Sequence, residues 1–121
     1  MAKTINLPTF KDERGNLTVI EKLIDFDIKR VYYIYSADNN IRGGHRHKNT
    51  KQLLVCISGE CSIYCENQKK ETHTYHLNSP ELSLYLEAED WHTMQDFTDD
   101  CILLVMASEY YDINDYIDER Y

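Results

Sequence analysis

Short runs of apolar, aromatic and β-branched residues recur along the whole chain, each bounded by residues that favour turns. Such runs predict β-strands, because these side chains fit a pleated, half-buried surface. Seven strands are predicted: Leu17–Glu21, Lys29–Tyr35, Gln52–Ser58, Cys61–Cys65, Thr72–His76, Leu82–Leu86 and Cys101–Ala107. Turn signals such as Ser58-Gly59-Glu60 and Asn78-Ser79-Pro80 separate them. The pattern indicates an antiparallel all-β sandwich or barrel.

The strands differ in how their apolar positions alternate. In Leu82–Leu86 the three leucines alternate with Ser83 and Tyr85, so the leucines should face a core and the other two the opposite side. Gln52–Ser58 is more continuously apolar and is expected to be buried on both faces. Ser108–Tyr121 changes character, with tyrosines among acids, and predicts a short helix or an arm that packs on a partner subunit.

The length of 121 residues predicts one domain, 1–121, with a barrel from about 5 to 108 and a C-terminal arm from about 109 to 121. No apolar run approaches the roughly 18 residues needed to cross a bilayer, and Met1–Phe10 does not resemble a signal peptide. We therefore expect a cytoplasmic protein without a membrane partner. Its four cysteines lie in strand-like segments and are expected to be buried free thiols.

Charge is distributed unevenly along the chain. The net charge of -8 argues against nucleic-acid binding, which depends on Lys and Arg side chains that neutralise phosphates. Residues 1–51 carry ten basic against six acidic side chains, about +4, whereas residues 52–121 carry three against fifteen, about -12. A local basic site in an acidic protein suits a small anionic ligand such as a nucleotide diphosphate. The alternative is uneven surface charge without function.

The pair His45 and His47 is the most informative chemical feature. On an extended segment, residues two apart lie about 6.6 Å apart on one face, so both imidazoles can reach one ligand while Arg46 points the other way. Together with Gln52 and Gly59 they have the spacing of the first cupin motif. Metal cupins usually carry Glu at the position of Gln52, and a neutral amide is a poor ligand for a hard divalent ion. The histidines are thus available for proton transfer.

Three segments in order, Asp12–Leu17, Lys29–Ile34 and Arg42–Lys48, resemble the WxcM-like sugar cupins, specifically the thymidine-diphosphate-4-keto-6-deoxyglucose (dTDP-4-keto-6-deoxyglucose) 3,4-ketoisomerases. Trp91–Met94 and Ala107–Asp112 extend the resemblance to nearly the full length. It implies an RmlC-like jelly-roll cupin barrel, homodimeric and free of metal and cofactor. It also implies an isomerase that moves the keto group of a dTDP-linked 4-keto-6-deoxy sugar from C4 to C3, in deoxy- or amino-sugar biosynthesis for a surface polysaccharide or glycan.

The same resemblance implies roles for individual residues. His47 matches the base that carries a proton between C3 and C4 through an enediol, and His45 the acid or oxyanion partner. An imidazole is neutral near pH 7 and suits this work. Arg30 and Tyr32 share one strand face and are placed at the ligand, where a guanidinium binds diphosphate bidentately. The further candidates for substrate contacts are Arg42, Lys48, Gln52 and Trp91.

Other readings of these residues stay open. Arg42 and Lys48 can be solvated strand-end charges, and Trp91 can belong to the core. His92 occupies the place of the histidine in a second cupin motif, so a metal cupin built on His45, His47 and His92 is an alternative, as is a non-catalytic sugar-nucleotide-binding protein. His73 and His76 are expected at the surface. Arg46 and Gly44 depart from the family pattern and affect the expected sugar contacts; the product configuration at C4 does not follow from the sequence.

Overall fold

The computed structural model describes all residues from Met1 to Tyr121 and is built almost entirely of β-strands. The strands are β1 (Lys3–Asn6), β2 (Thr9–Asp12), β3 (Gly15–Thr18), β4 (Arg30–Tyr35), β5 (Arg42–His47), β6 (Gln52–Ser58), β7 (Cys61–Glu66), β8 (Thr72–Leu77), β9 (Leu82–Leu86), β10 (Trp91–Gln95), β11 (Ile102–Ala107) and β12 (Tyr116–Ile117). The only helical segment is the 3₁₀ turn η1 (Ile113–Asp115), and no helix is long and apolar enough to cross a membrane.

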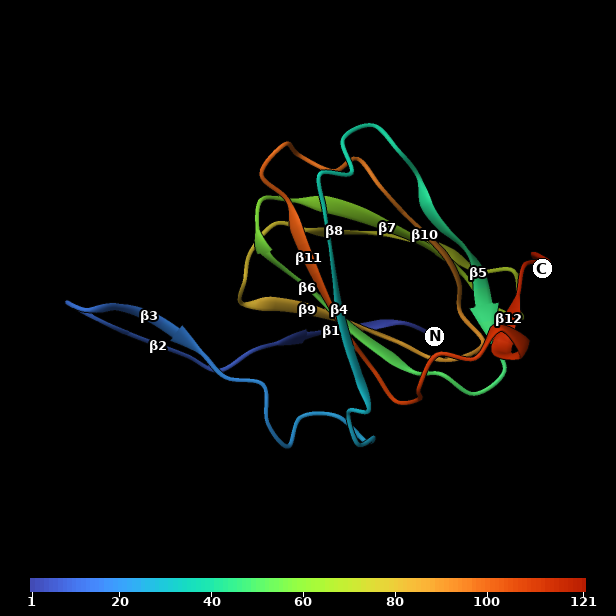
Figure 1. Cartoon of the computed structure of the whole chain (residues 1–121), viewed down its shortest axis with the longest axis horizontal. Helices are drawn as coiled ribbons and strands as arrows, with labels where there is room; N and C mark the ends of the chain where they lie inside the picture. The colour runs from blue at the N-terminus through green and yellow to red at the C-terminus, as the bar shows by residue number, and fades with distance from the viewer.

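Two five-stranded antiparallel sheets form the body of the molecule (Figure 1). The first sheet has the order β1-β9-β6-β11-β4 and the second the order β12-β5-β10-β7-β8. The two sheets form a cupin-type roll, which confirms the predicted all-β class. The remaining strands, β2 and β3, form a hairpin that projects away from the body (Figure 1).

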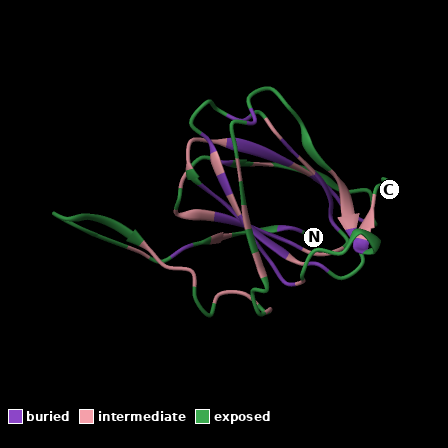
Figure 2. Cartoon of the chain, in the orientation of Figure 1, coloured by how far each residue is buried: buried purple, intermediate pink, exposed green.

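The core lies between the two sheets, where the buried segments gather in Figure 2. Its main cluster joins Leu54 and Leu84 of the first sheet to Ile63 and Met94 of the second. A smaller cluster, which includes Leu53 and Tyr85, lies on the other face of the first sheet. Partly buried side chains of residues 20–26 cover it. The first sheet is therefore buried on both faces over its central strands.

Most predicted strands are confirmed. β6 and β9 have the predicted bounds, and β4, β7, β8 and β11 differ by one residue at one end. Leu84 and Leu86 join the main core and Tyr85 the opposite cluster, as the alternation predicts. β6 is buried on both faces from Gln52 to Cys56, but Ile57 is exposed, contrary to prediction.

Other predictions were wrong or incomplete. The strand predicted at Leu17–Glu21 is β3 and ends at Thr18, because Ile20 packs with the segment that covers the first sheet. β1, β2, β5, β10 and β12 were not among the predicted strands. β5 contains two glycines and few strand-forming residues, and it is held by pairing with β10 on one side and β12 on the other.

All four cysteines are buried and unbridged, as predicted. Cys56 lies with its Sγ atom 3.4 Å from that of Cys61 and 3.7 Å from that of Cys101. The C-terminal segment contains η1 and β12, and β12 pairs with β5 of the same chain. The arm therefore closes the edge of the second sheet within its own subunit.

Candidate active site

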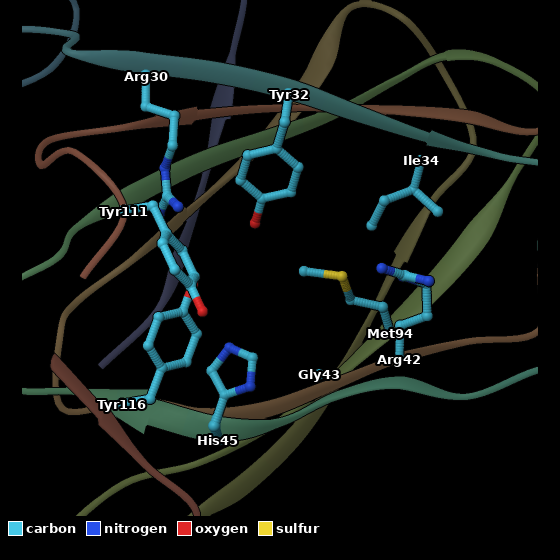
Figure 3. Close-up of a pocket in the computed structure, with 9 residues that line it drawn as sticks. All are labelled: Arg30, Tyr32, Ile34, Arg42, Gly43, His45, Met94, Tyr111 and Tyr116. Carbon is cyan, nitrogen blue, oxygen red and sulfur yellow. The ribbon is translucent and has the colours of Figure 1, made fainter. Parts of the chain in front are cut away.

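A cavity of about 350 Å³ opens between the edge strand of the first sheet and β5 of the second. β4 supplies one wall and β5 the opposite one, and Figure 3 shows their side chains directed toward each other. The lining residues are Arg30, Tyr32, Ile34, Arg42, Gly43, His45, Met94, Tyr111 and Tyr116. The cavity thus lies between β4, for which anion binding is predicted, and β5, for which proton transfer is predicted.

Strand alternation directs the β4 side chains into the cavity. Arg30, Tyr32 and Ile34 are half-buried, whereas Val31, Tyr33 and Tyr35 on the opposite face are exposed. The predicted shared face of Arg30 and Tyr32 is therefore confirmed. The Arg30 guanidinium lies 5.4 Å from the ring centre of Tyr32 and 5.7 Å from that of Tyr111, which orients it across the cavity wall.

Gly43 permits β5 to approach β10 closely. Its φ is +82°, and a Cβ atom there would lie 3.0 Å from the backbone oxygen of His92 and 3.3 Å from Cα of Thr93. The pairing register between β10 and β5 shifts at this place, between His92 and Thr93. Because of this local geometry, His45 lies directly opposite His92.

Three histidine rings pack together beside the cavity. The ring centres of His45 and His47 are 5.0 Å apart, those of His45 and His92 5.2 Å, and those of His47 and His92 6.2 Å. The Tyr116 ring lies 4.7 Å from both His45 and His47. His45 lines the cavity itself, while His47 and His92 are buried and do not line it. His47 borders a separate groove instead.

The surroundings keep the three imidazoles neutral. Burial lowers the pKa of His45, burial and the neighbouring His45 lower the pKa of His47 to about 4, and burial lowers the pKa of His92 to about 3. The Nδ1 atom of His92 lies 3.1 Å from the backbone oxygen of Asp90, to which it donates a hydrogen bond. Neutral imidazoles are bases at pH 7, and the Nε2 atoms of His47 and His92 are buried without a hydrogen-bond partner.

Gln52 links the interior of the barrel to the β4 wall. Its side-chain nitrogen donates a hydrogen bond of 2.9 Å to the Tyr32 hydroxyl, and its oxygen is buried without a partner. Burial raises the pKa of Tyr32, so the phenol keeps its proton. The Tyr32 oxygen, which Figure 3 shows directed into the cavity, already accepts from Gln52, so the hydroxyl hydrogen remains free to be donated.

Three of the predicted binding residues do not line the cavity: Gln52, which reaches it only through Tyr32, and Lys48 and Trp91, which lie elsewhere. Lys48 is exposed in the turn after β5 and borders a shallow groove outside the cavity. Trp91 is buried; its Nε1 donates to the backbone oxygen of Asp118 over 3.0 Å, and the Arg120 guanidinium lies 4.7 Å from its ring centre. Neither lines the cavity, so for Trp91 the geometry favours the packing role.

The remaining sequence expectations for histidine and arginine are met. His73 and His76 are exposed. Arg46 points away from the histidines: its Nε donates to the backbone oxygen of Glu119 over 3.1 Å, and its guanidinium lies 4.6 Å from the Tyr121 ring centre.

Sequence reasoning missed the aromatic part of the site. Tyr111 and Tyr116 line the cavity from the C-terminal arm, and Met94 lines it from β10. The accumulation of tyrosines after Ser108 is a signal in the sequence, but it predicts a short helix or an arm on a partner subunit and not a cavity wall. The position of these tyrosines depends on the return of the arm to β5, which no local pattern encodes.

The geometry does not favour a three-histidine metal site. The only three His, Cys, Asp or Glu residues whose ligand atoms all lie within 4.8 Å of one another are Cys56, Cys61 and Cys101. The ring nitrogens of His45, His47 and His92 do not converge in this way, as a tetrahedral or octahedral ion would require. The cysteine cluster lies in the apolar core, and burial raises the pKa of Cys101 to about 12, which disfavours the thiolate form that binds metals.

Comparison with known proteins identifies relatives over almost the full chain. The TDP-4-oxo-6-deoxy-alpha-D-glucose-3,4-oxoisomerase of Aneurinibacillus thermoaerophilus is 43% identical over 118 residues, 95% of this chain and 84% of that protein. The sugar 3,4-ketoisomerase QdtA of Thermoanaerobacterium thermosaccharolyticum, solved with TDP, is 44% identical with a TM-score of 0.92, over 98% of this chain and 88% of QdtA. A histidine-to-asparagine variant of QdtA has been solved with TDP-4-keto-6-deoxyglucose.

A third relative is the WlaRB TDP-quinovose 3,4-ketoisomerase of Campylobacter jejuni. It is 41% identical, with a TM-score of 0.91 over 98% of this chain and 92% of WlaRB. The family model described as "FdtA: WxcM-like, C-terminal" matches residues 1–121. With the barrel, the histidine pair and these relatives in agreement, the chain belongs to the WxcM-like FdtA family of sugar-nucleotide 3,4-ketoisomerases.

Proposed function

We propose that this protein converts a TDP-linked 4-keto-6-deoxyhexose into the 3-keto isomer by imidazole acid–base catalysis. The observation that carries the proposal is one cavity that joins Arg30 and Arg42 to His45, whose ring centre lies 5.0 Å from that of His47. The arginines can bind the diphosphate of the substrate, and the neutral histidines can accept and donate the protons that the isomerisation moves. The substrates in the names of the relatives support this choice.

The reaction needs one proton transfer at each of two carbons and at each of two oxygens, and no net oxidation. A base removes the proton at C3, the C4 carbonyl oxygen gains a proton, and an enediol forms. The C3 hydroxyl then loses its proton as C4 gains one, so the carbonyl lies at C3. His47 is proposed as the base for carbon, and His45 as the group that exchanges protons with the oxygens or hydrogen-bonds to the oxyanion. The Tyr32 hydroxyl is positioned to donate a further hydrogen bond to the substrate.

Substrate binding is assigned to the two walls of the cavity. Arg30 from β4 and Arg42 from β5 lie on opposite sides and can engage the diphosphate from both. Gln52 is proposed to act through Tyr32 and through its free side-chain oxygen. Lys48 and Trp91 have no support from the cavity geometry and remain sequence-based predictions.

Two features support a homodimer. The β2–β3 hairpin projects from the body (Figure 1). Phe10 and Leu17 lie opposite each other on it and are 64% and 60% exposed. Val31, Tyr33 and Tyr35 are exposed on the outer face of the edge strand β4. Exposed apolar side chains gathered on an unpaired edge are typical of an interface. We propose that a second copy of this chain covers these exposed side chains.

A cytoplasmic location is proposed because the four cysteines are unbridged.

A paired binding and turnover experiment tests the proposal. The purified protein is titrated with TDP by calorimetry, incubated with TDP-4-keto-6-deoxyglucose, and assayed for metals. We expect TDP binding, rearrangement of the keto sugar and full activity after chelation. Tight binding without rearrangement would instead identify a sugar-nucleotide-binding protein, and stoichiometric metal with activity lost to chelator would identify a metal cupin.

A further inference from the structure

The C-terminal arm contains one buried acid, Asp115, whereas most of the side chains around it are exposed. Asp115 ends the 3₁₀ turn η1, which Asp112 caps by accepting a 3.0 Å hydrogen bond from the Asn114 amide. The Asp115 amide donates a further 3.0 Å bond to the Asp112 carbonyl. The turn thus fixes the backbone from which the Asp115 side chain enters the protein.

Asp115 binds three consecutive residues of the turn that follows His47. Its backbone oxygen accepts a 2.9 Å hydrogen bond from the Lys48 amide. One carboxylate oxygen accepts a 2.8 Å bond from the Asn49 amide, and the other accepts the hydroxyl of the buried Thr50. A single residue therefore holds the connection between β5 and β6 just beyond the second histidine.

The next residue of the arm touches the histidines directly. Tyr116 pairs with His47 across β12 and β5, and its ring lies 4.7 Å from the rings of both His45 and His47. Tyr116 also lines the cavity. The anchor at Asp115 thus determines where the Tyr116 ring lies and how the end of β5 is oriented.

We propose that Asp115 is a positioning residue for the isomerisation, which ties the C-terminal arm to the β5–β6 turn and so holds His47 and Tyr116 against each other. The proposal rests on the proposed function, since it assigns a role in the same site. The carboxylate and backbone oxygens of Asp115 are engaged by the turn that follows His47, so it acts through its neighbours and not on the substrate. Small displacements of a catalytic base reduce the rate of the chemical step more than they weaken binding of a remote nucleotide.

The negative charge of Asp115 provides a second way to test its positioning role. Apart from burial, the groups that shift the pKa of His47 are His45 and Arg30, which lower it, and Asp115, which raises it. His92 and Tyr116 pack against its ring. The other charged groups beside it, which line the same groove, are Arg46, Lys48, Glu87 and Glu89. Asp115 stays ionised, because its hydrogen bonds from Thr50 and Asn49 outweigh burial and keep its pKa low. Removal of this charge should lower the pKa of His47 further.

The test is Asp115→Asn, compared with Glu119→Gln, which removes an exposed acid from the same arm. For Asp115→Asn we expect kcat to fall about 10²-fold, KM and the affinity for TDP to change less than about threefold, and the acid limb of kcat/KM to move to lower pH. Glu119→Gln should leave all four quantities unchanged. Equal kcat and an unmoved pH profile in Asp115→Asn, with the wild type active, would overturn the role.

Thr50→Val provides the test if Asp115→Asn does not fold, since it removes one bond to the carboxylate and keeps its charge and the side-chain volume. A smaller loss of kcat at unchanged TDP affinity is expected, and an undiminished kcat would overturn the proposal. A wild-type protein that binds TDP without turnover would instead defeat the proposed function. The two failures are therefore distinguishable.

Discussion

At the scale of single residues, His45 and His47 have different proposed roles in the proton transfers. His45 is part of the cavity wall, whereas His47 does not line the cavity and has a buried Nε2 atom without a hydrogen-bond partner. The family resemblance assigns the carbon base to His47, and the ring centres of His45 and His47 lie 5.0 Å apart. The two roles can be separated by substitution.

His47→Asn should abolish turnover while TDP binding remains measurable, because an amide cannot accept the C3 proton at neutral pH. We expect kcat to fall by at least about 10²- to 10⁴-fold, measured by conversion of TDP-4-keto-6-deoxyglucose. His45→Asn, the matched variant, should reduce kcat and retain some activity. Full activity of His47→Asn with an inactive His45→Asn would show that the base has been assigned to the wrong ring.

The pH dependence of kcat/KM tests the buried environment of His47. A base works only when it is unprotonated, and burial together with His45 lowers the pKa of His47 to about 4. The rate should therefore stay level as pH falls through the ordinary histidine value of about 6.5 and decline only at roughly pH 5 and below. A decline centred near the ordinary value would mean that the ring is solvated.

At the scale of elements, the close approach of β5 to β10 shapes the site. Gly43 and Gly44 share nearly the same left-handed backbone, with φ of +82° and +81°. A Cβ at Gly43 would press on the backbone of His92, whereas one at Gly44 meets no atom within 4 Å. A comparison of alanine substitutions at Gly43 and Gly44 can therefore distinguish the destabilisation caused by the positive φ from the destabilisation caused by contact with the His92 backbone.

Gly43→Ala should destabilise the protein by about 1–3 kcal/mol more than Gly44→Ala. The backbone cost of roughly 1–2 kcal/mol is common to both and cancels in the comparison. Gly43→Ala should also lower kcat, because it displaces β5 and with it His45. The measurements are urea unfolding and turnover of the two variants. Equal stability of both would contradict the close approach.

The sequence predicted the elements whose pattern is local. β6 is predicted from its continuous apolar run and β9 from its alternating leucines, and neither pattern needs knowledge of neighbouring strands. β5, with glycines and charges, is a strand only because β10 and β12 pair with it, so its strand character lies in tertiary contacts. For the same reason Arg30, Tyr32, Arg42 and His45 were placed in the site by alternation and resemblance, whereas Tyr111, Tyr116 and Asp115 were not.

At the scale of the whole molecule, the β2–β3 hairpin projects from the body, and its apolar side chains remain exposed in a single chain. Phe10 and Leu17 form one apolar face, and Lys11 and Asn16 the opposite one. An arm with an exposed apolar face gains stability when a second copy covers it. Light scattering should therefore give twice the chain mass of 14.4 kDa.

Leu17→Lys should shift this mass toward the monomer, since it places a charge in the proposed interface. Asn16→Lys adds the same charge on the other face of the hairpin and should leave the dimer intact. A monomeric wild type, or a Leu17→Lys dimer of undiminished stability on dilution, would contradict the assigned face.

The central claim is that two neutral histidines move protons on a TDP-linked keto sugar in this cavity. It is tested most directly by NMR of TDP-4-keto-6-deoxyglucose incubated with the protein in deuterated water and chelator. We predict that the carbonyl carbon signal moves from C4 to C3 as the proton signals at these carbons change. Absence of both rearrangement and exchange at C3, in a protein that binds TDP, would contradict the claim.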